Sequence, residues 1–294
     1  LSLRRQRQMC IRDRARTLSQ HMGPLLGESV VVENKVGAGG QIAAQTVARS
    51  PADGQTLLLG EVGSISISPA TYRNLNYDPP RDFAPISEVV RADFVLVVPA
   101  DSPYQDAPAL LAAIKEQPAG TFKASGTGQG GIWHLGLAGW LLSHDLAPNH
   151  VTFVPSQGAA SGITDMVAGG VDLIPSSLAE GRSMIEAGRV KALGTMSEGR
   201  QEAFPDVPTI KEALDSDWTL SVWRTVAAPK GLPDDVKAKL EAALEKVYNT
   251  DEYQKFMRDR GFGVRWAGGA EATQIVAQDD ATLGEVMKKA GLAK

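Results

Sequence analysis

The residues best suited to chemistry lie in a glycine-rich loop within KASGTGQGGIWHLGLAGWLL, residues 123–142. The pattern predicts that a strand ends near Ala124, that small residues then turn the chain, and that a helix begins near Ile132. The first N–H groups of a helix have no partner within the helix and lie at the positive end of its dipole. The loop is therefore suited to bind an anion, and phosphate and carboxylate both qualify.

A nucleotide is the competing ligand for such a loop. Gly126, Gly128 and Gly131 have the Gly-x-Gly-x-x-Gly spacing of dinucleotide-binding loops. The acidic residue that would bind the ribose is Asp145, but it falls in a predicted loop rather than at the end of a strand. A Walker loop is excluded because no lysine follows the last glycines. The spacing therefore leaves a dinucleotide open as the weaker alternative to a carboxylate.

Length and composition limit the class of protein. The chain has 294 residues, of which 43% are hydrophobic, so it can bury the core of one large domain or of two smaller ones. The formal net charge of −4 gives no broad attraction for nucleic acid or anionic lipid. The longest apolar runs, such as FVLVV, are far shorter than the roughly 20 residues that a membrane-spanning helix needs.

Metal, disulfide and catalytic chemistry have little support. Cys10 is the only cysteine, which excludes an intrachain disulfide and a cysteine-based zinc site. His134, His144 and His150 lack the close pairing of a metal-binding helix, so we expect ordinary hydrogen-bonding roles and no metal. The sequence contains neither Gly-x-Ser-x-Gly nor His-Glu-x-x-His. We therefore predict no cofactor and no catalytic residue, and interpret the chain as a protein that is not an enzyme.

The elements that must position the loop alternate between helix and strand. Strands separated by single helices imply parallel pairing through crossovers, so the predicted class is α/β and doubly wound. The predicted strands are 29–34, 56–60, 93–100, 121–124, 151–154, 171–174, 190–195 and one within 217–233. The predicted helices are 15–26, 40–50, 106–117, 131–143, 159–168, 179–187, 232–250, 251–261 and 268–292.

This order predicts two lobes joined by strands or short connections. The first lobe comprises residues 15–98 and 224–294, and the second comprises residues 99–223. The sequence shows no low-complexity linker between them. Strands or short connections between lobes are what a hinged, clamshell-like protein requires.

The first residues, LSLRRQRQMCIRDRAR, do not match the rest of the chain. They contain six arginines and one aspartate, whereas the whole chain is acidic. They contain no apolar region of the kind found in secretory signals. Because the run resembles translated sequencing-adapter sequence up to about Arg12, we interpret residues 1–14 as a segment foreign to the fold.

Several motifs together resemble one family. ENKVGAGGQIAA, LNYDPPRDFAPISEVV, SGTGQGGIWHLG, VPSQG and EGRQEAFPDVPTIKEA occur in the order seen in the extracytoplasmic substrate-binding proteins of tripartite tricarboxylate transporters, the Bug or TctC family. The resemblance implies two Rossmann-like lobes with a central cleft, a periplasmic binding protein-like fold of type II. It also implies a monomer in the periplasm that binds a small carboxylate and delivers it to the membrane subunits of a transporter.

The candidate ligand-binding residues lie on loops between strands and helices, where open α/β sheets bind ligands. Uncharged loop amides and hydroxyls can hold a carboxylate without an ion pair. The candidates in the second lobe are Ser125, Thr127, Gln129, Gly130, Gly131, Ser156, Gly158 and Ala159. Family members often have Tyr-Lys where Ser156 and Gln157 stand, so the ligand stays open among dicarboxylates, citrate, aromatic acids, nicotinate-like acids and acidic amino acids.

Further candidates come from other loops. In the first lobe Gly39 and Gly40 precede a helix, and Ser64 follows a strand. In the second lobe Asp172 borders a strand and could accept a hydrogen bond from an amine or hydroxyl of the ligand. Trp133 and Trp223 are assigned either to the walls of the cleft or to the core, and the pairs Asp234–Asp235 and Asp279–Asp280 are expected to lie in solvent.

One expected feature is missing. Family members begin with a strand that leads into a Pro-Gly-Gly-type loop, but residues 7–14 supply neither glycines nor an apolar strand. Arginines there could not be buried in a parallel sheet without partners. We therefore expect the first lobe to lack this strand and the chain as written to bind its carboxylate weakly or not at all. The alternative function is an α/β enzyme that acts on a carboxylate or a phosphorylated ligand.

Overall fold

The computed structural model describes residues 2–35, 40–63, 65, 77–259, 262–263 and 265–293, with side chains from residue 13 onward. The chain forms two compact units, of which unit 1 is Leu1–Arg91 with Trp223–Ala281 and unit 2 is Ala92–Val222 with Thr282–Lys294. It passes between the units within three elements, namely β2 (Phe83–Pro99), β7 (Ser221–Pro229) and α12 (Gly269–Lys289).

The last of these crossings differs from the expected division, which placed all of 224–294 in the first lobe. Residues from Thr282 onward belong to unit 2. The end of α12 is held there by apolar side chains, since Leu283 and Met287 are buried. The expected boundaries at 98/99 and 223/224 stay a prediction.

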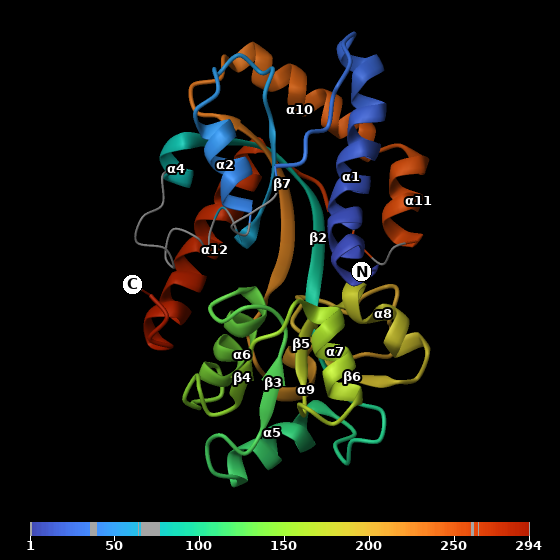
Figure 1. Ribbon diagram of the computed structural model, residues 1–294, viewed down its shortest axis with the longest axis vertical. Helices are drawn as coiled ribbons and strands as arrows, with labels where there is room; N and C mark the ends of the chain where they lie inside the picture. The colour runs from blue at the N-terminus through green and yellow to red at the C-terminus, as the bar shows by residue number, and fades with distance from the viewer. Residues whose placement is uncertain are drawn as a thin grey trace. The chain divides into compact units, whose positions relative to one another are not determined.

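Unit 1 is built on a small antiparallel sheet. β1 (Leu58–Glu61) pairs antiparallel with β7, β7 neighbours β2, and β8 (Ala267–Gly268) pairs antiparallel with β2. The helices of this unit are α1 (Ser2–Leu26), α2 (Gln41–Ala48), α4 (Pro79–Asp82), α10 (Asp234–Tyr248), α11 (Asp251–Asp259) and the first part of α12. Helix α1 lies beside α10 (Figure 1).

Two apolar clusters cover the two faces of this sheet. Along β7, Val226 and Ala228 belong to the cluster that includes residues of α1, α10 and α11, whereas Ala227 belongs to the cluster that includes residues of α2. This alternation follows from the strand geometry, because successive side chains point to opposite faces.

Unit 2 contains the parallel part of the fold. β3 (Lys123–Ser125) pairs parallel with β4 (Thr152–Val154), and Ala124 forms a parallel bridge with Leu173. β5 (Ile174–Ser177) and β6 (Val190–Thr195) each pair antiparallel with β2. The helices are α5 (Ala107–Glu116), α6 (Ile132–Leu142), α7 (Ala159–Val167), α8 (Leu178–Glu186), α9 (Ile210–Leu214) and the end of α12.

Two predictions of the sequence are wrong. Residues 29–34 form no strand, and their backbone makes no ladder hydrogen bonds to other residues that the structure describes. A strand depends on a neighbour, and no strand pairs with this segment within the described residues. The sheets are also not parallel throughout, because β7 and β2, which pass between the units, run antiparallel to β1 and to β5 and β6 respectively.

Residues 2–26 form a single helix rather than a strand and a loop. Arg14, in the part of this helix whose side chains are described, is buried, with its guanidinium 4.0 Å from the centre of the Phe262 ring. The expectation that this region supplies no strand is therefore consistent with the structure, whereas the origin of residues 1–14 stays an interpretation.

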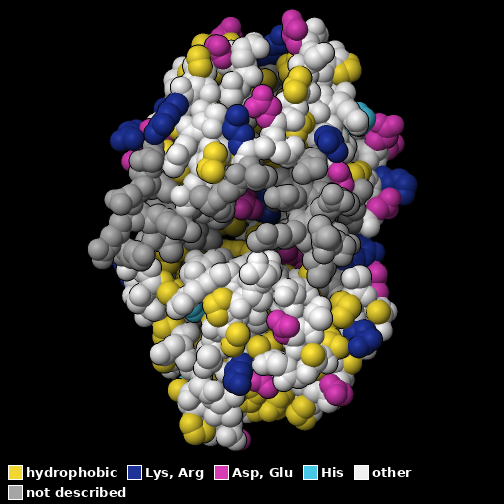
Figure 2. All heavy atoms as spheres, viewed as in Figure 1, with side chains coloured by type: hydrophobic (Ala, Val, Ile, Leu, Met, Phe, Trp, Pro, Cys, Tyr) yellow, Lys and Arg dark blue, Asp and Glu magenta, His cyan; other side chains and the backbone are white. Residues whose placement is uncertain are grey.

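No helix in the described ranges is both long and apolar enough to cross a bilayer. On the face shown in Figure 2, basic and acidic side chains are intermixed among the coloured residues. This distribution agrees with the small net charge of the chain.

Candidate functional site

Two loops of unit 2 meet where the parallel strands end. Loop 125–131 follows β3, and loop 155–158 follows β4. The Ser156 N–H donates to the Thr127 carbonyl at 3.1 Å, and Ser156 Oγ donates to the Gly126 carbonyl at 2.5 Å. The carboxyl ends of parallel neighbours lie at one edge of a sheet, so both helix starts are brought to the same place, as the sequence predicts.

Close contacts explain several glycines of these loops. A Cβ atom on Gly126 would lie 2.6 Å from Cβ of Trp133, and one on Gly131 would lie 2.7 Å from Thr127 Oγ1. Gly158 has φ 136°, a conformation that other residues rarely adopt. By contrast, a Cβ atom on Gly128 would meet nothing within 4 Å. Tight packing therefore fixes the first and last turns of loop 125–131.

The three hydroxyls of the predicted site have different surroundings. Ser125 is 1% exposed, and its Oγ donates to the Val154 carbonyl at 2.7 Å. Ser156 Oγ donates to Gly126 and also to the Gly158 carbonyl at 3.0 Å. Thr127 Oγ1 is buried and has no hydrogen-bond partner among the residues that the structure describes. The two serines hold the loops together, whereas the threonine keeps its hydrogen-bonding capacity.

The two glycine amides that the sequence assigns to the anion already have partners. The Gly130 N–H donates to Nδ1 of His134 at 3.0 Å, and the Gly131 N–H donates to the Gly128 carbonyl at 3.0 Å. The first residues of α6 and α7, Ile132 and Ala159, have N–H groups without a partner in the described part of the chain. These donors lie at the helix ends that favour negative charge.

His134 has the ordinary hydrogen-bonding role that the sequence predicts, but the sequence did not place it in this site. It is buried, its ring stacks on Phe153 with 4.4 Å between the ring centres, and it accepts the Gly130 N–H. Burial lowers the pKa of His134, which favours the neutral imidazole with an unprotonated Nδ1. Its position four residues after Gly130, within the first turn of α6, is the sequence signal for this role.

The two remaining candidates of unit 2, Asp172 and Gln129, make no hydrogen bond with the donors of the two loops in the described part of the chain. The Asp172 carboxylate accepts the Lys123 N–H at 2.7 Å, at the first residue of β3 rather than the last. That hydrogen bond ties Asp172 to the start of the strand, away from the end where Ser125 lies. The Gln129 side chain is exposed and makes no hydrogen bond within the described ranges.

The candidates of unit 1 are only partly described. Gly40 is the N-terminal cap of α2 and has φ 95°, in the left-handed region. Gly39 and Ser64 lie outside the described residues. Gly40 is therefore placed at a helix start, as predicted, and its role in ligand binding stays a prediction.

One surface assignment is wrong. Asp279 is half-buried and accepts a short hydrogen bond from the indole N–H of Trp223, which is 1% exposed. Burial raises the pKa of Asp279, and the indole hydrogen bond opposes that rise. Asp279 was misjudged because the Trp223 indole of β7 reaches it, whereas Asp234, Asp235 and Asp280 are exposed as expected. Trp133 is also buried, against Phe94 and Gly126.

No group of three or more His, Cys, Asp or Glu residues that could hold a metal ion occurs in the part of the chain that was searched. The donors that meet at the two loops are uncharged hydroxyl and N–H groups. Such donors can hold an anion by hydrogen bonds, but they do not form a metal site.

Comparisons with known proteins assign the chain to a family. It matches the family described as Tripartite tricarboxylate transporter family receptor, TctC, over residues 14–292. It is 36% identical over 257 residues to the UPF0065 protein in the tcbD-tcbE intergenic region of Pseudomonas sp. (strain P51), covering 87% of this chain and 74% of that protein.

Solved structures agree with this match. A TctC solute binding protein from Polaromonas superposes with a TM-score of 0.83 at 26% identity, covering 94% of this chain and 92% of that one. R. palustris Rpa4515, solved with adipate, gives a TM-score of 0.81 at 27% identity, covering 95% and 92%. The predicted α/β fold class of the periplasmic binding proteins is confirmed, and the chain belongs to the TctC family of tripartite tricarboxylate transporter receptors.

Proposed function

We propose that the protein is an extracytoplasmic solute-binding protein that captures a small carboxylate and delivers it to the membrane subunits of a tripartite tricarboxylate-type transporter. It acts as a monomer in the periplasm. The observation that carries the proposal is the buried Thr127 hydroxyl without a partner, beside the start of α6. Family membership indicates the class of function, and this hydroxyl indicates where in unit 2 the carboxylate binds.

The donors suit a carboxylate. A carboxylate offers two acceptor oxygens with about four lone-pair sites, and the first-turn N–H groups of α6 and α7 are unused donors. Hydrogen bonds to an ionised acceptor are shorter and stronger than those between neutral groups. The proposed contacts in unit 2 are the Thr127 hydroxyl with the N–H groups of Ile132 and Ala159. Ser125 and Ser156 fix the loops that carry these donors.

A linear dicarboxylate is the first ligand class to test, because a family member of known structure holds adipate. The two carboxylates of such a ligand are separated by an apolar chain. Only one of them needs to occupy the loops of unit 2.

We propose binding without turnover. The histidine beside the loop, His134, is buried with its Nδ1 engaged by Gly130, so it is not placed to act as a general base. The alternative of a carboxylate-processing enzyme has no observation in its favour among the described residues, and it is tested by looking for product.

The experiment is a thermal-shift panel followed by calorimetry. Straight-chain dicarboxylates from succinate to suberate, together with citrate, benzoate and glutamate, are added to the full chain. A ligand that binds only the folded state raises the melting temperature by mass action. The expected result is a rise for at least one dicarboxylate, small or absent in the chain as written and clear once residues 1–14 are replaced, with the ligand recovered unchanged by NMR after prolonged incubation.

Two outcomes would count against the proposal. Conversion of the ligand would establish an enzyme, and absence of any shift both in this chain and in one whose N-terminal segment is replaced would remove the carboxylate assignment. A chain in which residues 1–14 are replaced by an apolar strand and a Pro-Gly-Gly loop is included in the panel. It separates a wrong ligand class from a correct class that this N-terminal segment weakens.

A further inference from the structure

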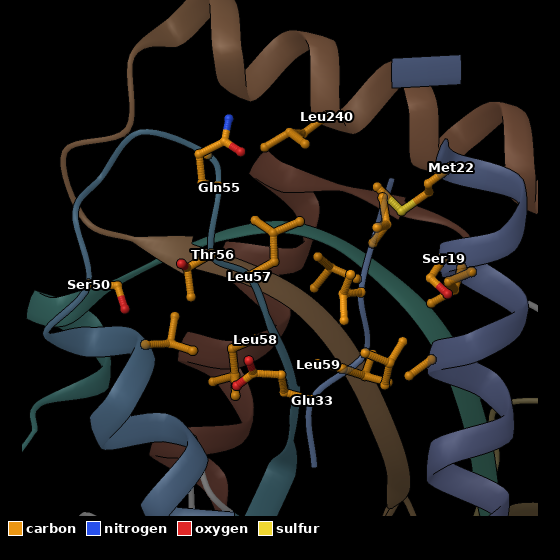
Figure 3. A pocket seen from close by; sticks show the side chains of 18 of the residues that line it. Ser19, Met22, Glu33, Ser50, Gln55, Thr56, Leu57, Leu58, Leu59 and Leu240 are labelled. Atoms are coloured by element: carbon orange, nitrogen blue, oxygen red, sulfur yellow. The ribbon is translucent and has the colours of Figure 1, made fainter. Parts of the chain in front are cut away.

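Unit 1 contains a cavity of about 1040 Å³, shown in Figure 3. Its lining mixes leucines with polar side chains and the Arg224–Glu61 ion pair, whose charged atoms lie 3.0 Å apart. It borders β1, which pairs with β7 on one side and with no strand on its other side in the described part of the chain. We expect the family's first strand at this open edge, and residues 1–14 do not supply it. The cavity therefore points to no ligand of its own.

In unit 2 the buried ring of His134 connects the two loops of the proposed carboxylate site. Its Nδ1 accepts the Gly130 N–H of loop 125–131 at 3.0 Å. The ring also stacks on Phe153 of β4, with the two ring planes inclined by 15°, and β4 leads into loop 155–158. One side chain of α6 therefore contacts both of the strand and loop segments that carry the site.

The hydrogen bond to Gly130 acts on the donors proposed for the ligand. Gly130 has φ 76°, and the chain turns there into the start of α6. The next residue, Gly131, has so little room that a Cβ atom on it would lie 2.7 Å from Thr127 Oγ1. Ile132 follows and carries the first N–H group of the helix. A shift of Gly130 would therefore change the distance between the Thr127 hydroxyl and this N–H group.

Only a ring without a proton on Nδ1 can make this hydrogen bond. In the neutral imidazole one nitrogen is an acceptor, whereas both nitrogens of the protonated ring are donors. Protonation would therefore set two donors, Nδ1–H and the Gly130 N–H, against each other across the present 3.0 Å. The contact that holds the loop would be lost.

The described surroundings of His134 place no charged side chain to stabilise the protonated ring. Loop 125–131, β4, loop 155–158 and α6 contain no Asp, Glu, Lys or Arg, and neither does β5, which packs against α6. β2 meets α6 through Phe94, and the charged residue beside it, Asp93, is engaged by other side chains. Burial accounts for the lowered pKa of His134. Protonation would therefore break the Gly130 contact without forming an ion pair in its place.

We propose that His134 is a positioning residue of the carboxylate site, whose neutral ring holds Gly130 and thereby keeps the Thr127 hydroxyl and the Ile132 N–H in the arrangement that binds the ligand. Protonation of Nδ1 releases Gly130 and weakens binding. The inference rests on the proposed function and adds an acid-sensitive contact to the same site. The charge of the imidazolium acts in the opposite sense, because it attracts a carboxylate, so the sign of the pH effect decides between the two.

The test compares three proteins by calorimetry between about pH 5 and 8, with adipate as the first probe and the best dicarboxylate of the panel as the second. H134N keeps an acceptor oxygen near the position of Nδ1 but does not titrate, whereas H134L removes the acceptor. Each substitution is made in the chain as written and in the chain whose residues 1–14 are replaced. H134N is the baseline, because its Kd changes with pH only through the ligand and through groups that the parent protein shares.

The expected values follow from the loss of one hydrogen bond. At about pH 8 the Kd of H134N should lie within a few-fold of that of the parent, and the Kd of H134L should be about three- to tenfold higher. As the pH falls to about 5, the Kd of the parent should rise about three- to tenfold relative to that of H134N.

NMR gives a measurement that needs no ligand. The nitrogen-15 shifts of the His134 ring should show the proton on Nε2 at neutral pH. Protection of the Gly130 N–H against hydrogen exchange should fall in the parent as the ring is protonated, and it should stay constant in H134N. By linkage, a bound dicarboxylate should lower the pH at which the ring gains its proton.

Three results would overturn the proposal. A constant ratio of the two Kd values over this pH range would show that protonation of His134 does not act on the site. Relatively tighter binding by the parent at acid pH would show that the imidazolium attracts the ligand directly. A proton on Nδ1 at neutral pH, or unchanged protection of Gly130, would show that the ring does not hold the loop.

Failure of the proposed function gives a different result. It would appear as absence of binding to every dicarboxylate of the panel in both chains, and it would remove the link between His134 and affinity. The NMR measurement would then still decide the role of His134 in the loop, because loss of Gly130 protection on ring protonation supports that role and constant protection overturns it.

Discussion

Replacing Thr127 by valine separates the two roles that a hydroxyl in this loop can have. Thr127 Oγ1 is buried and has no partner among the described residues, and a hydroxyl left in that state costs about 1–3 kcal/mol. Valine has nearly the same shape and no hydroxyl. T127V should therefore leave the free energy of unfolding of the unliganded protein unchanged or raise it by up to about 1–3 kcal/mol.

The same substitution should weaken ligand binding. A hydrogen bond to a charged group contributes about 1.5–3 kcal/mol. At a factor of ten for each 1.4 kcal/mol, the Kd for the carboxylate should rise roughly 10- to 150-fold. The opposite signs of the two effects distinguish a binding hydroxyl from a structural one.

Urea unfolding without ligand and isothermal calorimetry with the best dicarboxylate measure the two effects. T127S is the matched control, because it keeps the hydroxyl, and its Kd should stay within a few-fold of that of the parent protein. An unchanged Kd in T127V would remove Thr127 from the site. A large loss of stability in T127V would show that the hydroxyl has a structural partner and would refute the argument.

Three further predictions concern the loops and the N-terminal segment. G126A should lower stability by about 1–3 kcal/mol, because its Cβ would overlap Trp133, whereas G128A, with open space around it, should stay within about 1 kcal/mol in urea unfolding. Burial lowers the pKa of His134, so its contribution to stability is complete above the unfolded value of about 6.5 and is lost as the pH falls through the lower folded value. H134N, which keeps an acceptor but does not titrate, should flatten that acid decline in melting temperature, and an unaltered decline would assign it to another group. Replacing residues 1–14 by an apolar strand and a Pro-Gly-Gly loop should lower the Kd for the carboxylate in calorimetry, and an equal Kd would show that this segment does not limit binding.

Most elements of unit 2 could be predicted because their signals are local. α6 and α7 begin within a residue of the expected positions, since glycine turns and helical apolar spacing both act within a few residues. β5 begins at Ile174, three residues later than expected. In the structure the N–H groups of Asp172 and Leu173 instead donate to the Lys123 carbonyl. Lys123 lies 49 residues from Asp172 in the sequence. Sequence spacing gives no sign of that contact.

The failed strand at residues 29–34 shows the same limit more strongly. The segment is rich in valine, as strands are, yet Val31 is 80% exposed and the segment forms no ladder with the described part of the chain. β propensity describes how well a side chain fits a pleated, half-buried surface. The property that decides the outcome is whether a neighbouring strand is present, and that information lies elsewhere in the chain.

The candidate site could be predicted as a place more readily than as a set of contacts. Glycine content and helix starts identified both loops, but the partners of individual donors depend on the fold. The hydroxyls of Ser125 and Ser156 are used to join the loops, and the Gly130 N–H is used by His134. Substitutions at these positions should therefore lower the affinity for the ligand by changing the loop geometry, and they should lower the stability of the fold as well. Among the predicted hydroxyls that the structure describes, that of Thr127 is not used in this way, so we expect T127V to lower affinity without lowering stability.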